Sequence, residues 1–230
     1  MAKVAKTVAP KSPDDASPVK RQSRSLATRQ KLLDGARKSF EERGYHGSRI
    51  SDITENAGVA LGNFYRHFEN KNEIFAEVLR PIFEAWHASS GRSVHEKPAR
   101  TIEELAERNA RYISVFVDHK MLFRAGYEAA SSIQSDHFFG TWFDLREMFF
   151  ARSRAWLAGV KHDGLAREDI NIDLMAEALG AMNEQFIYIR VIRNENKLED
   201  DEINMMARML AEIWWRTLFN EQATQNKKLQ

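Results

Sequence analysis

The chain has 230 residues, of which 43% are hydrophobic and 29% charged, and its formal net charge is +1 at pH 7. This length suffices for one large domain or two small ones with a buried apolar core. No run approaches the roughly eighteen apolar residues of a membrane-spanning helix, and the first residues lack the apolar stretch of a secretory signal. The lack of cysteine excludes disulfides and thiolate metal sites. Together these features predict a cytoplasmic protein with no membrane partner.

The near-neutral total conceals an uneven distribution of charge. Residues 1–80 carry 15 Lys and Arg against 10 Asp and Glu, whereas residues 81–230 carry 19 against 23. A basic front part and a mildly acidic rear part fit contact with nucleic acid at one end of the molecule. Ordinary fluctuation in composition produces similar numbers, so the asymmetry identifies no partner by itself.

Residues 1–24 show neither helical nor strand periodicity. Prolines and serines alternate there with Ala and scattered Lys, which predicts a disordered N-terminal arm. The chain from Lys20 to Lys31 is basic and contains no acid. Such an arm either follows DNA phosphates and enters a minor groove, or is only a solubilising tail. The first helix is expected from about Ser25 to Arg43.

Residues 44–71 are the most informative stretch of the sequence. Ile50, Ile53 and Ala57 fall at i, i+3 and i+7, which predicts the buried stripe of a short helix. Gly58 stands where a helix takes its left-handed stop. A second stripe follows with the same helical spacing: Leu61, Phe64, Tyr65 and Phe68. Helices this short must pack on each other and on a third helix, which predicts a helix-turn-helix whose second helix lies in a DNA major groove.

This stretch resembles the DNA-binding domain of tetracycline-repressor (TetR) type transcriptional regulators. The shared motifs are Gly44-Tyr45, Asp52-Ile53, Ala57-Gly58-Val59, the run from Phe64 to Phe68, and Asn70-Lys71. The resemblance covers roughly residues 26–86, and the length and helical C-terminal half also fit the family. Ala60 departs from the pattern, because the family often has Ser or Thr there, and this change removes one phosphate hydrogen bond.

The resemblance implies a role for each side chain of the recognition helix, which is expected from Leu61 to Phe68. Base contacts are implied for Leu61, Gly62 and Asn63. Gly62 lets the backbone approach the groove, and the Asn63 amide pairs with adenine or a phosphate. Phosphate contacts are implied for Ser48, Arg49, Tyr65, His67 and Lys71. Tyr65 as part of the core and His67 as a partner of Glu69 are open alternatives. Ser48 is also expected to be the N-cap of the first helix of the helix-turn-helix, which follows it.

From residue 70 onward the sequence is helical in pattern. A helix opens at Asn70, with Glu73 in a variant of the capping box, and continues to about Ser89 with a kink at Pro81. Further helices are expected at 101–118, 120–134, 136–161, 172–194 and 200–220. The predicted fold class is therefore all-α. Its parts are a helix-turn-helix domain at 25–71, with the motif at about 49–68, and a helical effector-binding and dimerisation domain at 72–230.

A homodimer is expected, because a palindromic DNA operator is read by two recognition helices. The last two helices carry more apolar residues than one buried stripe requires. The candidates for the dimer interface are Met182, Ile189, Met205, Met209, Ile213 and Trp214. Trp214 and Trp215 are adjacent and cannot point the same way, so at least one of them is expected at the interface. Ordinary core packing is the alternative for all of these residues.

The stretch 121–156 contains more large rings than a single buried stripe can take. By the resemblance this region walls a ligand cavity, which implies a small apolar or aromatic effector. The candidate lining residues are Trp86, Phe123, Tyr127, Phe138, Trp142, Phe143 and Phe186. Core packing is the alternative for each of them.

The enzyme and metal motifs sought in the sequence are missing. No phosphate-binding loop, dinucleotide fingerprint, nucleophile elbow or zinc-protease motif occurs. Glu84 and His87 match half of a di-iron site, but no second pair of this kind exists. We therefore expect no catalytic activity, no metal and no cofactor.

The resemblance implies a ligand-responsive transcriptional repressor that a small effector releases from a palindromic operator. The alternative is a DNA-bound regulator controlled by a protein partner, with no small-molecule effector. A closed apolar cavity favours the first, and a filled core with an exposed apolar patch favours the second. The sequence names neither the effector nor the operator nor the regulated genes, and it does not separate repression from activation.

Overall fold

The computed structural model describes residues 18–89, 99, 101–131 and 136–219, apart from some side chains at 18 and between 136 and 145. In these ranges the chain forms α-helices and one π-helical turn, with a single isolated β-bridge. The elements are α1 (Pro18–Gly47), α2 (Ile50–Ala57), α3 (Leu61–Phe64), α4 (Lys71–Ser89), α5 (Ile102–Asp118), α6 (Lys120–Ala130), α7 (Asp136–His162), α8 (Ile172–Ile187), η1 (Tyr188–Ile192) and α9 (Asp200–Leu218). The all-α fold class is confirmed.

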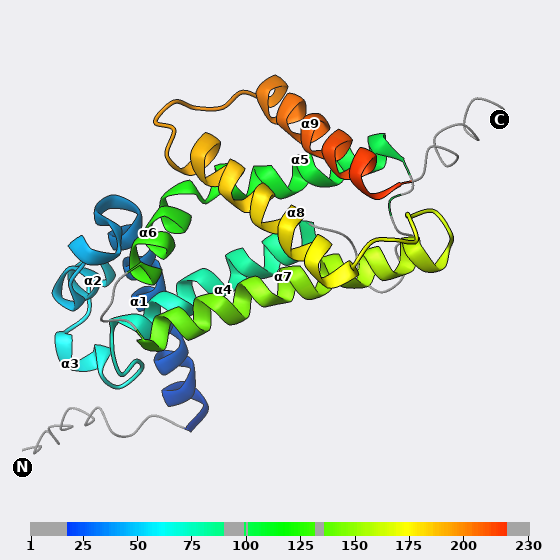
Figure 1. Cartoon of the computed structure of the whole chain (residues 1–230). Coiled ribbons are helices and arrows are strands. Elements are labelled where there is room, and N and C mark those ends of the chain that lie inside the picture. Colours follow the sequence, from blue (N-terminus) through cyan, green and yellow to red (C-terminus); the bar gives the residue numbers. More distant parts are fainter. Residues whose placement is uncertain (1–17, 90–98, 100, 132–135, 220–230) are drawn as a thin grey trace, which may run out of the picture.

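The helices form a small head and a larger body (Figure 1). The head, at the left of the view, consists of α1, α2 and α3. In the body, α4 and α7 lie side by side along the long axis, and α5 packs against α9. None of the described helices combines the length and apolar composition needed to cross a membrane.

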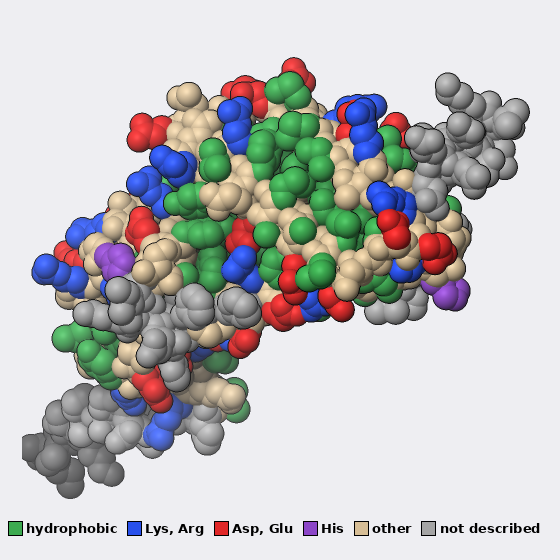
Figure 2. All heavy atoms as spheres, in the orientation of Figure 1, with side chains coloured by type: hydrophobic (Ala, Val, Ile, Leu, Met, Phe, Trp, Pro, Cys, Tyr) green, Lys and Arg blue, Asp and Glu red, His purple; other side chains and the backbone are tan. Residues whose placement is uncertain are grey.

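Hydrophobic side chains gather on the outer face of α8 and α9 (Figure 2). The exposed members of this apolar face are Leu174 on α8, Ile189 on η1 directly after it, and Met205, Met209 and Ile213 on α9. The inner faces of the same helices are buried in the body, where Ala176, Leu179 and Leu210 belong to the core. The two helices are therefore apolar on both sides, which is unusual for a surface that faces only water.

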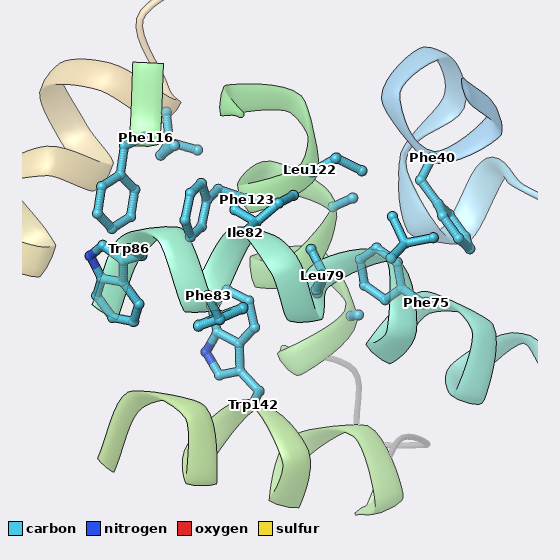
Figure 3. Close-up of a cluster of buried hydrophobic side chains, with 14 of the residues drawn as sticks. Phe40, Phe75, Leu79, Ile82, Phe83, Trp86, Phe116, Leu122, Phe123 and Trp142 are labelled. Atoms are coloured by element: carbon cyan, nitrogen blue, oxygen red, sulfur yellow. The ribbon is translucent and has the colours of Figure 1, made fainter. Parts of the chain in front are cut away.

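Helix α4 runs through the apolar core that joins the head to the body (Figure 3). Near its start Phe75 meets Phe40 of α1, with ring centroids 4.5 Å apart. Farther along, Phe83 and Trp86 meet rings of the body, and the Phe83–Trp142 centroids are 5.3 Å apart. The helix continues through Pro81, whose side is exposed to solvent. One helix thus buries apolar side chains in both parts of the molecule.

The first helix departs from its expected start. It begins at Pro18 and not near Ser25, so residues 18–24, predicted as part of the disordered arm, are helical. Proline fits the first position of a helix, and the following residues contain no Gly or Pro before Gly35. Leu26 is exposed, and Leu32 takes the buried position. The remainder of the predicted arm, residues 1–17, lies outside the described residues.

The two adjacent tryptophans of α9 are both buried within the chain, which leaves little of either side chain for the expected dimer interface. The Trp214 Nε1–H donates to Asn183 Oδ1 of α8 at 3.1 Å. The Trp215 ring stacks on Phe219, with centroids 3.8 Å apart. Trp214 is thus held by α8 and Trp215 by the residue that follows α9 directly, and the sequence pattern alone does not reveal these contacts.

Helices α1 and α2 approach each other closely at Gly35. A Cβ atom at this position would lie 2.7 Å from the Ile53 carbonyl oxygen and 2.8 Å from the Ala57 nitrogen. Both atoms belong to the α2 backbone, so they cannot turn aside as a flexible side chain does. Glycine at this position lets α1 and α2 pack backbone to backbone.

The substitution Gly35→Ala is expected to lower the free energy of unfolding by about 1–3 kcal/mol, because the added methyl group overpacks the contact. Urea denaturation measures the change. Gly159→Ala in α7 is the matched control, since a Cβ there meets nothing within 4 Å. The control should hold or raise stability by up to about 1 kcal/mol. Equal stability of the two variants would contradict the close approach.

Candidate functional site

The turn between α2 and α3 is built as the sequence indicates. Gly58 has a left-handed φ of 63° and closes α2 by donating its N–H to the Glu55 carbonyl. The Val59 N–H donates to the Thr54 carbonyl at 3.0 Å. At the other end of α2, the Asp52 carboxylate accepts the Arg49 N–H at 2.9 Å. The expected left-handed stop at Gly58 is confirmed, but Arg49 and not Ser48 is the residue at the N-cap.

The recognition segment is shorter as a helix than expected. The α-helix spans Leu61–Phe64, and the chain then continues in turns, with the Phe68 N–H bonded to the Phe64 carbonyl at 3.0 Å. Gly62 and Asn63 favour helix weakly, and a new helix start follows at once. There Asn70 Oδ1 accepts the Glu73 N–H at 3.0 Å, which confirms the expected cap. Phe64 and Phe68 are buried and anchor the segment.

Of the eight expected DNA-contact residues only Ser48 is buried, and Lys71 is partly buried by contacts within the head. Leu61 and Tyr65 are 51% and 59% exposed, which removes the alternative of Tyr65 as a core residue. A Cβ at Gly62 would meet nothing within 4 Å. We call six of the expected contact residues the recognition face: Arg49, Leu61, Gly62, Asn63, Tyr65 and His67. It combines apolar, amide and basic groups on a protruding turn of the head.

Ser48 does not belong to this face, which corrects the expectation of a phosphate contact. Its side chain is buried, and the hydroxyl is directed at the carbonyl oxygens of Ser39 (2.9 Å) and Gly44 (2.8 Å). Gly44 interrupts α1 with a φ of 69°, so the chain turns back and carries Ser48 under α1. The hydroxyl therefore satisfies backbone acceptors inside the head.

Lys71 is bound within the head through its ammonium group. Its Nζ donates to the carbonyl oxygens of Tyr45 (2.8 Å) and Ser48 (3.1 Å) and lies 4.2 Å from the centre of the Tyr45 ring. Burial lowers the pKa of this amine below its usual value. The ammonium ties the start of α4 to the α1–α2 connection, which accounts for a cation at a helix N-terminus without any phosphate.

Further basic side chains lie on α1, outside the helix-turn-helix motif. Lys20, Arg21 and Arg24 are exposed on the first turns of α1, in the segment that the sequence assigned to a disordered arm. Farther along α1, Arg29 pairs with Glu77 at 2.9 Å and lies 5.0 Å from the Phe68 ring centre. The helical placement of Lys20, Arg21 and Arg24 could have been predicted from the sequence, because residues 19–34 contain neither Gly nor Pro.

A cavity of about 410 Å³ lies between α6 and the junction of α8 with η1. Its lining is polar and aromatic: Arg124, Tyr127, Glu128, Ser131, Gln185 and Tyr188. Behind it, the Tyr127 hydroxyl donates to Glu184 Oε1 at 3.1 Å, and Arg146 Nε donates to Glu184 Oε2 at 3.0 Å. Burial, and next the negative charge of Glu184, raise the pKa of Tyr127 well above its usual value.

In the described part of the chain, rings of the expected ring-lined pocket pack on one another and on other rings of the core. Trp86 stacks on Phe149, with centroids 5.1 Å apart. Phe123 stacks on Phe116 at 4.2 Å (Figure 3). Trp86, Phe123 and Trp142 are buried, and Phe186 packs against the same core. Of the expected lining residues with described side chains, only Tyr127 borders the cavity. The side chains of Phe138 and Phe143 lie outside the described residues.

The Glu84–His87 pair makes no metal site among the residues that the structure describes. Arg152 Nη1 donates to the His87 carbonyl at 2.6 Å and lies 3.2 Å from its Nδ1. In the described ranges no three His, Cys, Asp or Glu side chains are grouped as metal ligands would be. His87 therefore has a structural partner in Arg152.

Two family models match the chain. Residues 32–78 match the family described as bacterial regulatory proteins, tetR family. Residues 105–220 match the C-terminal domain of the transcriptional regulator EthR. The first match contains α2, α3 and the turn between them, and the second covers the helices around the cavity and the apolar face.

Individual proteins extend the likeness over most of the chain. The HTH-type transcriptional regulator EthR of Mycolicibacterium smegmatis is 23% identical over 199 residues, 86% of each chain. The HTH-type transcriptional repressor DhaR of a Mycobacterium species is 25% identical over 172 residues, 74% of this chain and 86% of the relative.

Solved structures share the fold. A TetR-family regulator from Mesorhizobium loti superposes with a TM-score of 0.65 at 19% identity, covering 86% of this chain and 99% of the other. SmeT in its complex with triclosan gives a TM-score of 0.65 at 18% identity, covering 86% and 94%. With the recognition face and the two family matches, these likenesses lead to one assignment: the chain belongs to the TetR family of DNA-binding transcriptional regulators, which are not enzymes.

Proposed function

We propose that the protein is a homodimeric repressor that holds a palindromic operator and is released by a small molecule bound in its body. The observation that carries the DNA-binding part is the recognition face, which is exposed while Phe64 and Phe68 behind it are buried. The relative DhaR is a repressor, which supports repression over activation. The head at 25–71 then reads DNA, and the rest of the chain, 72–230, senses the effector and dimerises.

The contacts with DNA divide by chemistry. Leu61, Gly62 and Asn63 stand at the start of the recognition segment and contact base edges, with the Asn63 amide suited to adenine. Arg49, Tyr65 and His67 flank the segment and contact the phosphates. Ser48 and Lys71 take no part, since both are engaged with backbone carbonyls inside the head.

The apolar face of α8 and α9 is the proposed dimer interface. Its exposed Leu, Ile and Met side chains would pack on the same helices of a second copy and form an intersubunit four-helix bundle. Met182 is half-buried beside it, whereas the buried Trp214 supports the interface from within. Two heads arranged in this way read half-sites about 34 Å apart, one turn of DNA.

The effector is proposed to bind in the body. SmeT, a structural neighbour, has been solved in complex with triclosan, so a small molecule is bound by a protein of this fold. An effector releases DNA only if it binds the DNA-free conformation more tightly, and a coupling of about 1–3 kcal/mol is typical.

A protein partner is the second candidate for control of the regulator. It is favoured by the filled ring cluster around Trp86 and by the apolar face, which could receive a different protein. The mass of the purified protein distinguishes the two candidates. If the protein is a dimer, a second copy covers the apolar face of α8 and α9. If it is a monomer at micromolar concentration, the apolar face is free to bind a different protein.

Selection of bound DNA from a random duplex pool tests DNA reading directly. The purified protein should enrich a two-fold palindrome with half-sites about one helical turn apart. The experiment is read by sequencing at moderate salt, because non-specific phosphate binding weakens as salt rises. Folded protein that enriches no motif would overturn the proposal of a sequence-specific repressor.

Gly62→Ala separates recognition from folding. A Cβ there meets nothing within 4 Å in the free protein, so stability should hold or rise by up to about 1 kcal/mol. Operator affinity should fall by about 1–3 kcal/mol, because the methyl group keeps the backbone from the groove. Fluorescence anisotropy with the selected operator measures the loss. Gly140→Ala in α7, which also has open space, is the control and should bind as the natural protein does.

The double substitution Met205→Glu with Met209→Glu tests the dimer interface. Met205 is 65% exposed, so charges there should leave the fold of one chain intact while repelling the second copy. Light scattering should report a dimer for the natural protein and a monomer for the variant. Met148→Glu places a charge at an exposed site on α7 and should leave the dimer unchanged. A variant that still dimerises would place the interface elsewhere.

A further inference from the structure

The cavity between α6 and α8–η1 has a lining with distinct chemistry. Two aromatic rings form part of the wall, those of Tyr127 and Tyr188, with centroids 4.7 Å apart. Arg124 and Glu128 add one positive and one negative group, and their Nε and Oε1 atoms are 3.6 Å apart. Both are partly exposed, so the pair is weak and can be exchanged for other partners.

The same wall touches the head. Glu128 Oε2 lies against Gly44, where a Cβ atom would be only 2.6 Å away. The backbone oxygen of Glu128 is 3.2 Å from His46 Nε2. Gly44 is the residue at which α1 breaks, and its carbonyl accepts the Ser48 hydroxyl. Glu128 therefore contacts the point where the chain turns from α1 toward α2 and the recognition face.

The opposite wall is irregular. Tyr188 opens the π-helical turn η1, and its carbonyl accepts the Arg193 N–H at 2.9 Å. A π-helical turn is rare and is found frequently at functional sites, since it re-aims side chains within a helix. Here it follows directly on α8 and brings Tyr188 to the cavity beside Tyr127.

We propose that this cavity binds a small aromatic molecule carrying both an anionic and a cationic group, and that Glu128 transmits its binding to the head. The inference rests on the proposed repressor function and names the ligand class and the contact that regulates it. The ring lies against Tyr127 and Tyr188, the anionic group pairs with Arg124, and the cationic group pairs with Glu128. The expected effector is thus aromatic, one of the two classes that the resemblance implied, and it carries two charged groups in addition.

Binding changes the head because the Glu128 carboxylate cannot hold both positions. In the free protein it rests on Gly44 and faces Arg124. A ligand cation draws the carboxylate into the cavity and away from Gly44, while the ligand anion takes Arg124. The α1–α2 connection then loses a contact on its body side. The two recognition faces of a dimer shift, and the operator is released.

Three matched probes test the ligand class: 3-phenylpropionate, phenethylamine and phenylalanine, which share a ring and short chain but differ in charge. Operator affinity is measured by fluorescence anisotropy at increasing concentration of each probe. Phenylalanine should weaken operator binding by about fivefold or more. The two singly charged probes should act at clearly higher concentrations. Equal action of all three would overturn the two-charge assignment.

A cavity-filling substitution tests the coupling without any ligand. Ser131→Trp places a ring in the cavity and should weaken operator binding by itself. Met121→Trp, at an exposed site on the same helix outside the cavity lining, is the control and should not. In the Glu128→Gln variant, operator affinity should be the same with and without phenylalanine. The comparison is made within this variant, because the substitution itself can change the affinity.

The outcomes separate the two proposals. If the natural protein selects no operator, the repressor function itself fails. If the operator binds but neither phenylalanine nor Ser131→Trp changes its affinity, the cavity is not the regulatory site and the inference is overturned. Loss of operator binding in Ser131→Trp, with a circular dichroism spectrum and unfolding midpoint like those of Met121→Trp, supports it.

Discussion

The whole structure depends on the apolar side of α4, which belongs to the head and to the body at once. Phe75 packs on Phe40 and Tyr45 near the start of the helix, and Phe83 and Trp86 pack in the ring cluster of the body. Protein cores are close-packed and do not deform continuously, so a displacement of these rings is carried along the helix. Buried residues of the head and of the body belong to one continuous hydrophobic cluster, so the position of the head depends on the packing of the body.

A second connection lies on the other side of the head, where α1 meets α6. Arg37 of α1 is 3.2 Å from His119 Nδ1, and Gly44 meets the Glu128 carboxylate. The head is therefore held from two sides. Helix α4 supplies an apolar contact, and α6 adds these polar contacts to buried apolar residues of its own, Leu122, Ala125 and Ala129. Apolar packing is stable but insensitive to small polar ligands, whereas an exposed ion pair is weak and responsive. In our account α4 maintains the arrangement and α6 adjusts it.

Much of the fold could be predicted because burial follows from periodicity. Ile53, Phe64 and Phe68 are buried as their spacing indicates, and Gly58 has the left-handed conformation that its position requires. Among the expected DNA contacts, the side chains that turn inward are polar residues whose partners lie in other parts of the chain. Ser48 and Lys71 find backbone carbonyls that the break at Gly44 brings together, and no pattern in one dimension displays such a meeting. Likewise, the many aromatic residues of the stretch 121–156 indicated a pocket. Whether such rings surround an empty space or pack on one another depends on how the helices pack, which the sequence does not give.

The central claim, that head and body form one cooperative unit through α4, is tested by urea unfolding followed with two probes. All five tryptophans lie between positions 86 and 215, so their fluorescence reports the body. Hydrogen exchange of the Ile53 and Phe64 amides along the same urea series reports the head. The account predicts that both signals change at the same urea concentration. Loss of protection in the head at distinctly lower urea, with tryptophan fluorescence unchanged, would show that the head unfolds alone and would contradict the shared core.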